Sequence, residues 1–210
     1  MILKKPLVSI IITYFNKREF VCETLESILN QTYKNFELIF VYDDPNNKDL
    51  KYIKNLLKKF KKKKIIVNKK NLGVAKSRNK ALSRCSGKYV AFIDSDDIWK
   101  KIKLSQQINF MIKNSLEFCF TSYDIIGEKN ESLGRRTVNI DGDYKKIYES
   151  NYIGLSTVIL NRKIANTFKF PSLQTQEDFA LWLLLLRKGY KLNHLKPVLS
   201  KWRKTKESLS

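Results

Sequence analysis

Residues 88–100 read KYVAFIDSDDIWK, an apolar run that ends in three carboxylates within four positions. The run itself, Lys88–Ile93, has the length and composition of a buried strand. The acids that follow it are Asp94, Asp96 and Asp97, in a chain whose 41 Lys and Arg outnumber its 20 Asp and Glu. A cluster of like charges directly after a strand indicates a site at which a positive group neutralises them.

The residues before this strand show a regular alternation of apolar runs and helical patterns. Strands are predicted for Val8–Phe15, Phe36–Tyr42 and Lys64–Val67, and helices for Lys17–Gln31, Asp49–Lys61 and Gly73–Cys85. The strands are near-continuous apolar runs, which predicts a parallel sheet with both faces covered. Right-handed crossovers would bring the carboxyl ends of these strands to one edge, where ligands of such sheets bind.

After Trp99 the alternation becomes less regular. Helices are predicted for Lys101–Lys113, Tyr144–Ser150 and Gln176–Lys188, and strands for Leu116–Ile126, Leu155–Leu160 and Tyr190–Leu199. The polar stretch 127–142 is interpreted as a loop or hairpin, and residues 201–210 as a basic tail. Neither an internal repeat nor a linker rich in Gly, Pro or Ser divides the sequence, so we expect one domain.

Two of the predicted strands end in acids, because Asp43 and Asp44 follow Phe36–Tyr42 in the same way. In a parallel sheet both groups lie at one edge, where close carboxylates raise one another's pKa unless a cation neutralises them. Mg²⁺ or Mn²⁺ prefers carboxylate oxygens together with substrate phosphates. The plainer alternative is a solvated turn with an Asp cap for the helix at Lys101. Capping accounts for one Asp, whereas three acids and a second pair favour a cation that holds a diphosphate.

Five segments taken together resemble family 2 glycosyltransferases of the GT-A fold. They are PLVSIIITYFN (Pro6–Asn16), ELIFVYDD (Glu37–Asp44), NLGVAKSRNKAL (Asn71–Leu82), YVAFIDSDD (Tyr89–Asp97) and QEDFALWLLLLRKG (Gln176–Gly189). Each motif is weak alone, but all five in order form a specific signal over almost the whole chain. The resemblance implies a Rossmann-like three-layer α/β/α sandwich, with a mostly parallel central sheet and a short antiparallel part on the acceptor side.

The resemblance also implies how the single domain is divided and what it does. Residues 1–98 would form the nucleotide-sugar-binding half, residues 99–200 the acceptor-binding half and residues 201–210 the tail. The implied reaction is an inverting transfer of a sugar from a nucleotide-sugar, and a UDP-sugar is the first donor expected. The implied acceptor is a glycan or lipid-linked saccharide in surface polysaccharide synthesis.

Individual roles carried over by the resemblance fall on residues of the matching motifs. The nucleotide-sugar would be held by Thr13, Tyr14, Asp43, Asp44, Arg78, Asp94 and Asp96, and Mn²⁺ or Mg²⁺ by Asp96 and Asp97. Asp178 would be the catalytic base, with Glu177 beside it, since an inverting transfer needs a carboxylate that takes the acceptor's proton. Helix capping is the alternative for these two acids, and a surface arginine the alternative for Arg78. Trp182 is expected in the core or as a platform for the acceptor.

Two departures from the family pattern affect the expected site. Pro45-Asn46-Asn47 replaces the usual small turn after the second strand's acids, which changes the expected contact with the base. Near the C-terminus, Thr205 stands where relatives often carry a His near the metal. The chain's one histidine, His194, lies inside the last predicted strand and is expected to be structural. The metal's shell would then be completed by water or by the diphosphate.

The net charge of +21 indicates an anionic partner or surface. The densest basic run is KKFKKKK at Lys58–Lys64, which is interpreted equally well as part of a membrane-facing surface or as a solvated helix end. Nucleic acid is not expected as a partner, because no helix-turn-helix, zinc-finger or RNA-binding motif accompanies the charge. The alternative is a catalytically degenerate GT-A protein that only binds its ligand. This alternative stays open because Thr205 replaces the His that relatives often carry near the metal.

Cysteine content and apolar run length indicate the compartment. Cys22, Cys85 and Cys119 are odd in number and far apart, which predicts free thiols in a reducing environment. The N-terminal apolar stretch is short and lacks a small-residue cleavage site, and the longest apolar run, Phe179–Leu186, is too short to span a bilayer. We expect a cytoplasmic protein that works on the cytoplasmic face of the membrane as a peripheral protein.

Overall fold

The computed structural model describes residues 5–137 and 145–206. The strands in this part of the chain are β1 (Val8–Tyr14), β2 (Phe36–Tyr42), β3 (Lys63–Val67), β4 (Tyr89–Asp94), β5 (Ile98–Trp99), β6 (Phe118–Ile126), β7 (Ser132–Arg136), β8 (Ile159–Asn161) and β9 (Asn193–Arg203). The helices are α1 (Arg18–Leu29), α2 (Leu50–Leu57), α3 (Val74–Leu82), α4 (Lys103–Lys113), α5 (Lys145–Glu149), α6 (Arg162–Thr167) and α7 (Glu177–Arg187), with a 3₁₀ turn η1 (Leu155–Thr157).

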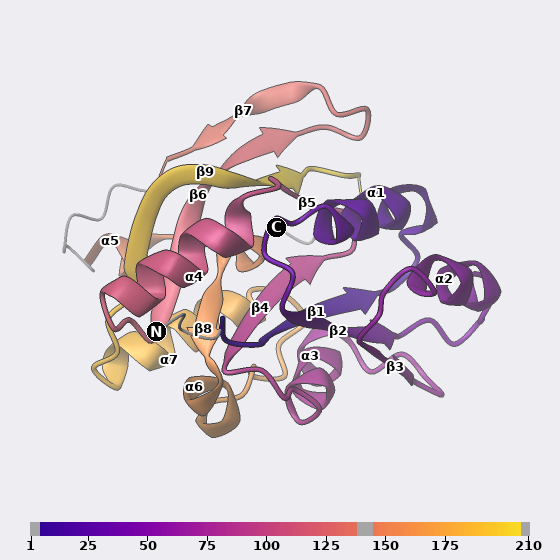
Figure 1. Cartoon of the computed structure of the whole chain (residues 1–210), viewed down its shortest axis with the longest axis horizontal. Helices are drawn as coiled ribbons and strands as arrows, with labels where there is room; N and C mark the ends of the chain where they lie inside the picture. The colour runs from indigo at the N-terminus through magenta and orange to yellow at the C-terminus, as the bar shows by residue number, and fades with distance from the viewer. Residues whose placement is uncertain (1–4, 138–144, 207–210) are drawn as a thin grey trace.

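All the strands belong to one sheet in the order β3-β2-β1-β4-β8-β6-β9-β5, and β7 pairs with β6 as a hairpin (Figure 1). The first four strands in this order are parallel, as are β6 and β9. Antiparallel pairing links β8 to β4 and β6, and β5 to β9. The predicted α/β fold with a mostly parallel sheet and an antiparallel part in the second half is therefore confirmed.

Helices cover both faces of this sheet and give it two separate apolar cores. On one face α1, α2 and α4 bury side chains such as Leu25, Ile53 and Ile108 against β1 and β2. On the other face α3, α6 and α7 bury side chains such as Leu82 and Trp182. Alternate residues of β1 enter opposite cores, as expected for a strand in the middle layer of a three-layer sandwich.

In the second half, the bounds of two predicted strands were wrong and one helix was not predicted. The predicted strand Leu155–Leu160 divides into η1 and β8, because the amide of Thr157 bonds to the Gly154 carbonyl and closes a turn. A helix that was not predicted, α6, follows directly and is capped by the side chain of Asn161. The strand β9 runs on to Arg203, so residues 201–203 are part of the sheet and not of a tail.

The remaining predicted elements overlap with observed ones. The polar stretch 127–142 contains β7 and forms the expected hairpin up to residue 137, while residues 138–144 lie outside the described residues. The strand β5 directly follows the acidic cluster and was not predicted, because its two residues are too few to show a periodic pattern. Among residues 5–137 and 145–206, every helix is too short or too polar to cross a lipid bilayer.

Candidate functional site

The carboxyl ends of β1, β2 and β4 lie side by side at one edge of the sheet. Thr13 is in register with Val41 on one neighbouring strand and with Asp94 on the other. The acids that follow β2 and β4 therefore meet at the same edge, as parallel pairing requires. This edge is the frame on which the predicted site residues are arranged.

Arg78 connects the acidic cluster to a distant helix. Its guanidinium is buried, with Nη2 2.6 Å from Oδ1 of Asp94 and Nη1 in contact with Oε1 of Glu177. The alternative that Arg78 is a surface arginine is thus wrong. A buried guanidinium needs its carboxylate partners, because one left unpaired would cost several kcal/mol. Arg78 brings together the end of β4 and the start of α7, which are far apart in the sequence.

Asp178 follows Glu177 in the first turn of α7. Its Oδ1 accepts hydrogen bonds from the Phe179 amide at 2.6 Å and from Nδ2 of Asn151 at 3.3 Å. Burial raises the pKa of Asp178 to about 6, with Arg78 opposing this increase and Glu177 adding to it. A carboxyl group with such a pKa is ionised at neutral pH yet remains a competent proton acceptor.

The residue before α7 has an unusual backbone. Gln176 has a φ of 58°, in the left-handed region that non-glycine residues rarely occupy. Asn16, which follows β1 at the same edge of the sheet, has a φ of 47°. Two such conformations directly before the residues of a site are consistent with backbone strain held in place for function.

Asp96 is paired with a cation that the sequence did not indicate. The ammonium nitrogen of Lys17 lies 3.3 Å from Oδ2 of Asp96 and donates to Oγ1 of Thr205 at 2.9 Å. Burial and the neighbouring Asp94 raise the pKa of Asp96, while Lys17 opposes this effect. Lys17 thus stands between Asp96 and the position at which relatives were expected to carry a His.

Asp97 points into the interior of the protein. One of its oxygens, Oδ1, accepts a hydrogen bond of 2.9 Å from the Arg203 amide, which ties the end of β9 to the acidic cluster. Its other oxygen, Oδ2, is buried without a hydrogen-bond partner among the described residues. Burial, followed by the charges of Asp96 and Asp94, raises the pKa of Asp97 well above its usual value.

The two consecutive carboxylates offer a limited set of metal ligands. Within the part of the chain that the structure describes, no three His, Cys, Asp or Glu side chains are grouped so as to hold a metal ion. Asp96 and Asp97 nevertheless supply hard oxygen donors, and the unpartnered Oδ2 of Asp97 is the kind of atom that a cation satisfies. These residues fit a divalent ion that takes its other ligands from phosphate oxygens and water.

Asp43 and Asp44 are both buried at the end of β2. Oδ1 of Asp43 accepts hydrogen bonds from Nδ2 of Asn68 at 2.8 Å and from the Leu72 amide at 2.9 Å. Oδ1 of Asp44 accepts a hydrogen bond of 3.0 Å from the Asn46 amide, within the turn that departs from the family pattern. Asp43 therefore holds the loop that leads into α3, and Asp44 shapes its own turn.

Tyr14 and Thr13, which were predicted together, lie in different surroundings. The ring of Tyr14 is fully buried and stacks on Tyr42 at a centroid distance of 5.2 Å. Its hydroxyl donates to Oδ2 of Asp49 at 2.7 Å, and Arg18 donates to the other oxygen of Asp49. The Tyr14 side chain therefore belongs to the core, whereas Thr13 is half-buried beside Asp94.

Two other aromatic residues from the sequence analysis are structural. Trp182 is fully buried in α7, and its indole nitrogen donates to the Ile153 carbonyl at 3.2 Å. It lies in the core and is not a platform for an acceptor. His194 lies in β9, stacked on Phe120 and 3.1 Å from the Ser122 hydroxyl, as expected for a structural histidine.

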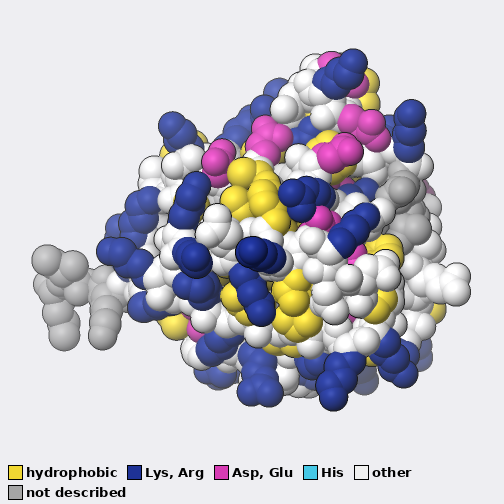
Figure 2. Space-filling model, turned by 90° about the vertical axis from the view of Figure 1, so that its right-hand side faces the viewer, with side chains coloured by type: hydrophobic (Ala, Val, Ile, Leu, Met, Phe, Trp, Pro, Cys, Tyr) yellow, Lys and Arg dark blue, Asp and Glu magenta, His cyan; other side chains and the backbone are white. Residues whose placement is uncertain are grey.

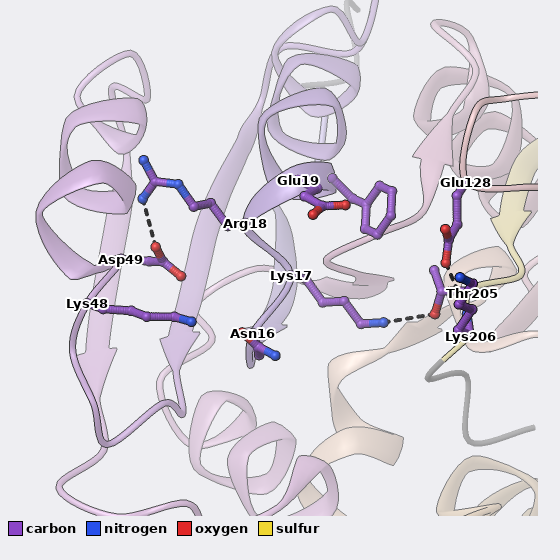
Figure 3. A pocket seen from close by; sticks show the side chains of 10 residues that line it. Asn16, Lys17, Arg18, Glu19, Lys48, Asp49, Glu128, Thr205 and Lys206 are labelled. Carbon is purple, nitrogen blue, oxygen red and sulfur yellow. Dashed lines mark hydrogen bonds and ion pairs between the residues drawn. The ribbon is translucent and has the colours of Figure 1, made fainter.

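A pocket of about 360 Å³ adjoins Lys17, between the starts of α1 and α2 and the last described residues (Figure 3). Its lining residues are Asn16, Lys17, Arg18, Glu19, Phe20, Lys48, Asp49, Glu128, Thr205 and Lys206. In Figure 3, Lys17 reaches toward Thr205 on one side of the pocket, and Arg18 toward Asp49 on the other. Among these lining residues is Thr205, which stands where relatives were expected to carry a His near the metal.

Sequence reasoning assigned no site role to Lys17, Asp49 and Arg203, and it did not predict the contact of Ser156 with the end of β4. Asp49 and Lys17 were placed only at the starts of predicted helices, although both follow strands that end at the site's edge. Ser156 accepts a hydrogen bond of 3.0 Å from the Asp94 amide, but it comes from a turn that was predicted as a strand. Proximity to the carboxyl end of a strand could have identified Lys17 and Asp49. The sequence carried no signal for the contacts of Ser156 and Arg203.

Comparisons with known proteins identify the family to which the sequence is similar. The profile of glycosyl transferase family 2 matches residues 9–172. TuaG of Bacillus subtilis (strain 168), which bears the name of a teichuronic acid biosynthesis glycosyltransferase, is 33% identical over 207 residues, covering 98% of this chain and 82% of TuaG. The Escherichia coli UDP-Glc:alpha-D-GlcNAc-diphosphoundecaprenol beta-1,3-glucosyltransferase WfgD is 38% identical over 181 residues, covering 86% of this chain and 70% of WfgD.

A solved structure agrees with the fold. The structure of Staphylococcus aureus TarS 1-349 in complex with UDP-GlcNAc superposes with a TM-score of 0.75 at 22% sequence identity. The superposition covers 96% of this chain but 59% of that one, so the chain spans little more than half of the solved protein. The likeness extends to the architecture of the sheet and its covering helices.

Proposed function

The chain belongs to glycosyl transferase family 2, and from this premise we propose that it transfers a sugar, with inversion, from a UDP-linked donor to a lipid-linked saccharide or another glycan. Family membership makes the chain a glycosyltransferase, and the donor, the acceptor and the stereochemistry are the proposal. The name of WfgD supports a UDP-sugar donor and a lipid-linked acceptor. The name of TuaG supports a place in surface polysaccharide synthesis.

The observation that carries this proposal is the pair of contacts made by Arg78. Asp94 belongs to the strand end where a nucleotide-sugar is expected, and Glu177 adjoins the expected catalytic base, Asp178. Because one buried guanidinium contacts both Asp94 and Glu177, the donor side and the base side form one site. Two separate acidic helix caps would not need such a link.

The donor's nucleoside is assigned to the ends of β1 and β2. Thr13 is half-buried at this edge, and Asp43 and Asp44 order the two loops beside it. The contact of Tyr14 is restricted to its main chain, since its ring is buried. Arg78 and the strand-end acids Asp94 and Asp96 would face the ribose and the diphosphate.

Mn²⁺ or Mg²⁺ would be held by Asp96 and Asp97, together with phosphate oxygens of the donor. When bound, such an ion supplies Lewis-acid stabilisation of the charge that develops on the leaving diphosphate. The chain's own contribution is to place both carboxylates at the end of β4, where the Arg203 amide holds Asp97 and the Lys17 ammonium neutralises Asp96.

Asp178 is assigned as the base that takes the proton from the acceptor hydroxyl as its oxygen bonds to the anomeric carbon. Hydrogen bonds from the Phe179 amide and Asn151 orient its carboxylate. Glu177 completes the catalytic pair, and its contact with Arg78 keeps the start of α7 against the donor side. A positioned base of this kind contributes about 10²–10⁴-fold to a rate.

The membrane is proposed as the surface on which the lipid-linked acceptor is met. The stretch 50–67 contains no Asp or Glu, and its lysines form an exposed basic edge along α2 and β3: Lys51, Lys54, Lys58, Lys59, Lys61, Lys62, Lys63 and Lys64. Figure 2 looks onto the side of the molecule that carries α2 and β3, where dark blue Lys and Arg side chains predominate. Each lysine near an anionic membrane adds about 1 kcal/mol of attraction.

The first experiment is a calorimetric titration of UDP, GDP and dTDP with and without Mn²⁺. We expect UDP to bind most tightly, and only with Mn²⁺ and an intact Asp96, so the same titration of Asp96→Ala should show little heat. Binding of no nucleotide by the wild-type protein would contradict the donor site. UDP binding without turnover of any UDP-sugar would instead favour a degenerate protein that only binds its ligand.

A further inference from the structure

Lys17 forms an ion pair with Asp96 at the position assigned to the divalent cation. Its ammonium lies 3.3 Å from Oδ2 of Asp96 and 2.9 Å from Oγ1 of Thr205. The side chains of Lys17 and Asp96 are 17% and 16% exposed, so the pair is largely shielded and yet reachable from solvent. A cationic side chain of the protein itself thus contacts a carboxylate that the proposed function assigns to the metal ion.

The three acids after β4 differ in how firmly their partners are held. Asp94 is bound by Arg78, a buried and planar guanidinium that is also held by Glu177. Asp97 is bound by a main-chain amide of β9. The partner of Asp96 is a lysine, a compact charge on a flexible four-carbon stem, and it extends from the residue just before α1. Of these partners, Lys17 is the one that can move without breaking the fold.

The pocket beside Lys17 provides a place for the displaced ammonium. It has a volume of about 360 Å³, and Lys17 itself forms part of its wall (Figure 3). Three carboxylates also line it, those of Glu19, Asp49 and Glu128. An ammonium that leaves Asp96 can therefore remain solvated and close to negative charge, which keeps the cost of the movement low.

We infer that Lys17 and the divalent cation exchange at Asp96, with the ammonium neutralising Asp96 until the metal ion enters and then moving into the adjoining pocket. This inference rests on the proposed function for the metal's place at Asp96. Because Lys17 competes for the same carboxylate, the metal alone binds weakly. Binding then becomes strong when the donor's phosphates add ligands to the ion and anionic charge for the freed ammonium.

The test measures binding of Mn²⁺ alone, in the absence of nucleotide, by the electron paramagnetic resonance signal of the free ion. We expect Lys17→Met to bind Mn²⁺ roughly tenfold more tightly than the wild type, equivalent to the loss of one competing ion pair. Lys48→Met is the matched control, since Lys48 lines the same pocket and the substitution removes the same charge. We expect its Mn²⁺ affinity to stay within about twofold of the wild type's.

Further variants separate the exchange from a general effect of charge or of folding. Lys17→Met combined with Asp96→Asn should lose the gain in Mn²⁺ affinity. Lys17→Gln, which keeps a polar partner for Thr205, should reproduce the gain if Lys17→Met folds poorly. Unchanged Mn²⁺ affinity in both Lys17 variants, or an equal gain in Lys48→Met, would overturn the inference.

The outcome for the proposed function is read independently from the wild-type protein. If wild-type protein binds UDP with Mn²⁺ and the Lys17 variants gain no affinity for Mn²⁺ alone, the exchange is wrong and the donor site stands. If wild-type protein binds no nucleotide with Mn²⁺, the proposed donor site is wrong. A gain in the Lys17 variants would then still establish that Lys17 competes with a cation at Asp96.

Discussion

At the scale of single residues, each acid of the site has a different state because it has a different neighbour. Asp94 faces a buried guanidinium, Asp96 a movable ammonium, and Asp97 a main-chain amide. Asp178 forms no ion pair with the residues that the structure describes, and burial is the main cause of its raised pKa. In the proposed function the same side-chain type would serve binding at β4 and proton transfer at α7, because the environment of a carboxyl group sets its charge.

The pKa of Asp178 predicts how the rate depends on pH. Below about pH 6 its carboxyl group is protonated and cannot accept the acceptor's proton, so the rate of sugar transfer should rise with pH and level off above that value. We expect Asp178→Asn to lower the rate by about 10²–10⁴-fold and to abolish this rise. The rate is measured as UDP released from a UDP-sugar in the presence of a lipid-linked acceptor.

UDP affinity in the presence of Mn²⁺ is the control for this variant and should change little, because Asp178 is not assigned to the donor. A wild-type rate that is flat between pH 5 and 8, or an Asp178→Asn protein with near-normal turnover, would contradict the assignment of Asp178 as the base.

At the scale of elements, the start of α3 shapes the site. The helix α3 begins after Gly73, whose φ of 80° and ψ of 160° lie in a region that essentially only glycine occupies. The amide of Gly73 donates to Oδ1 of Asn71 at 2.8 Å, and Asp43 holds the next residue back, Leu72. This sharp entry directs α3 so that Arg78 reaches the end of β4.

Replacement of Gly73 by Ala tests the role of this entry. A Cβ at Gly73 meets no atom within 4 Å, so the cost of Gly73→Ala comes from the backbone and should be about 1–3 kcal/mol of unfolding free energy. We also expect weaker binding of UDP with Mn²⁺, because a changed entry moves Arg78. Urea denaturation and calorimetry measure the two effects.

Gly189→Ala is the matched control, since Gly189 also has a positive φ, of 83°, and open space at its Cβ position, but it follows the other end of α7. It should lose stability and keep its affinity for UDP. Equal losses of UDP affinity in both variants would mean that Gly73 acts through stability alone.

At the scale of the whole molecule, charge is distributed unevenly relative to the site. The basic edge of α2 and β3 has no acid in sequence between residues 50 and 67, whereas five acids lie at the ends of β2 and β4. Lysines on an edge strand also discourage pairing with another sheet, which is an alternative reason for Lys63 and Lys64. A membrane test separates these two roles.

The proposal for the basic edge predicts binding to anionic vesicles. Replacing Lys58, Lys59, Lys61 and Lys62 with Gln should weaken binding to vesicles that contain phosphatidylglycerol, measured by co-sedimentation, by up to about 10³-fold at physiological salt, since four lysines at about 1 kcal/mol each contribute about 4 kcal/mol. Binding should fall as salt increases. The matched control replaces four exposed lysines elsewhere, Lys113, Lys129, Lys188 and Lys191. An equal loss in the control would show that net charge alone causes the binding.

The sequence by itself determined the layers of the fold and the edge at which the acids meet. Continuous apolar runs such as those of β1 and β4 specify buried parallel strands, and parallel pairing then fixes where Asp43 and Asp94 lie, because β1, β2 and β4 end at the same edge. Only the tertiary structure decided that Arg78 is buried between Asp94 and Glu177, that the Tyr14 ring belongs to the core and that Lys17 is paired with Asp96. These contacts join segments far apart in the chain, and local periodicity carries no information about such partners.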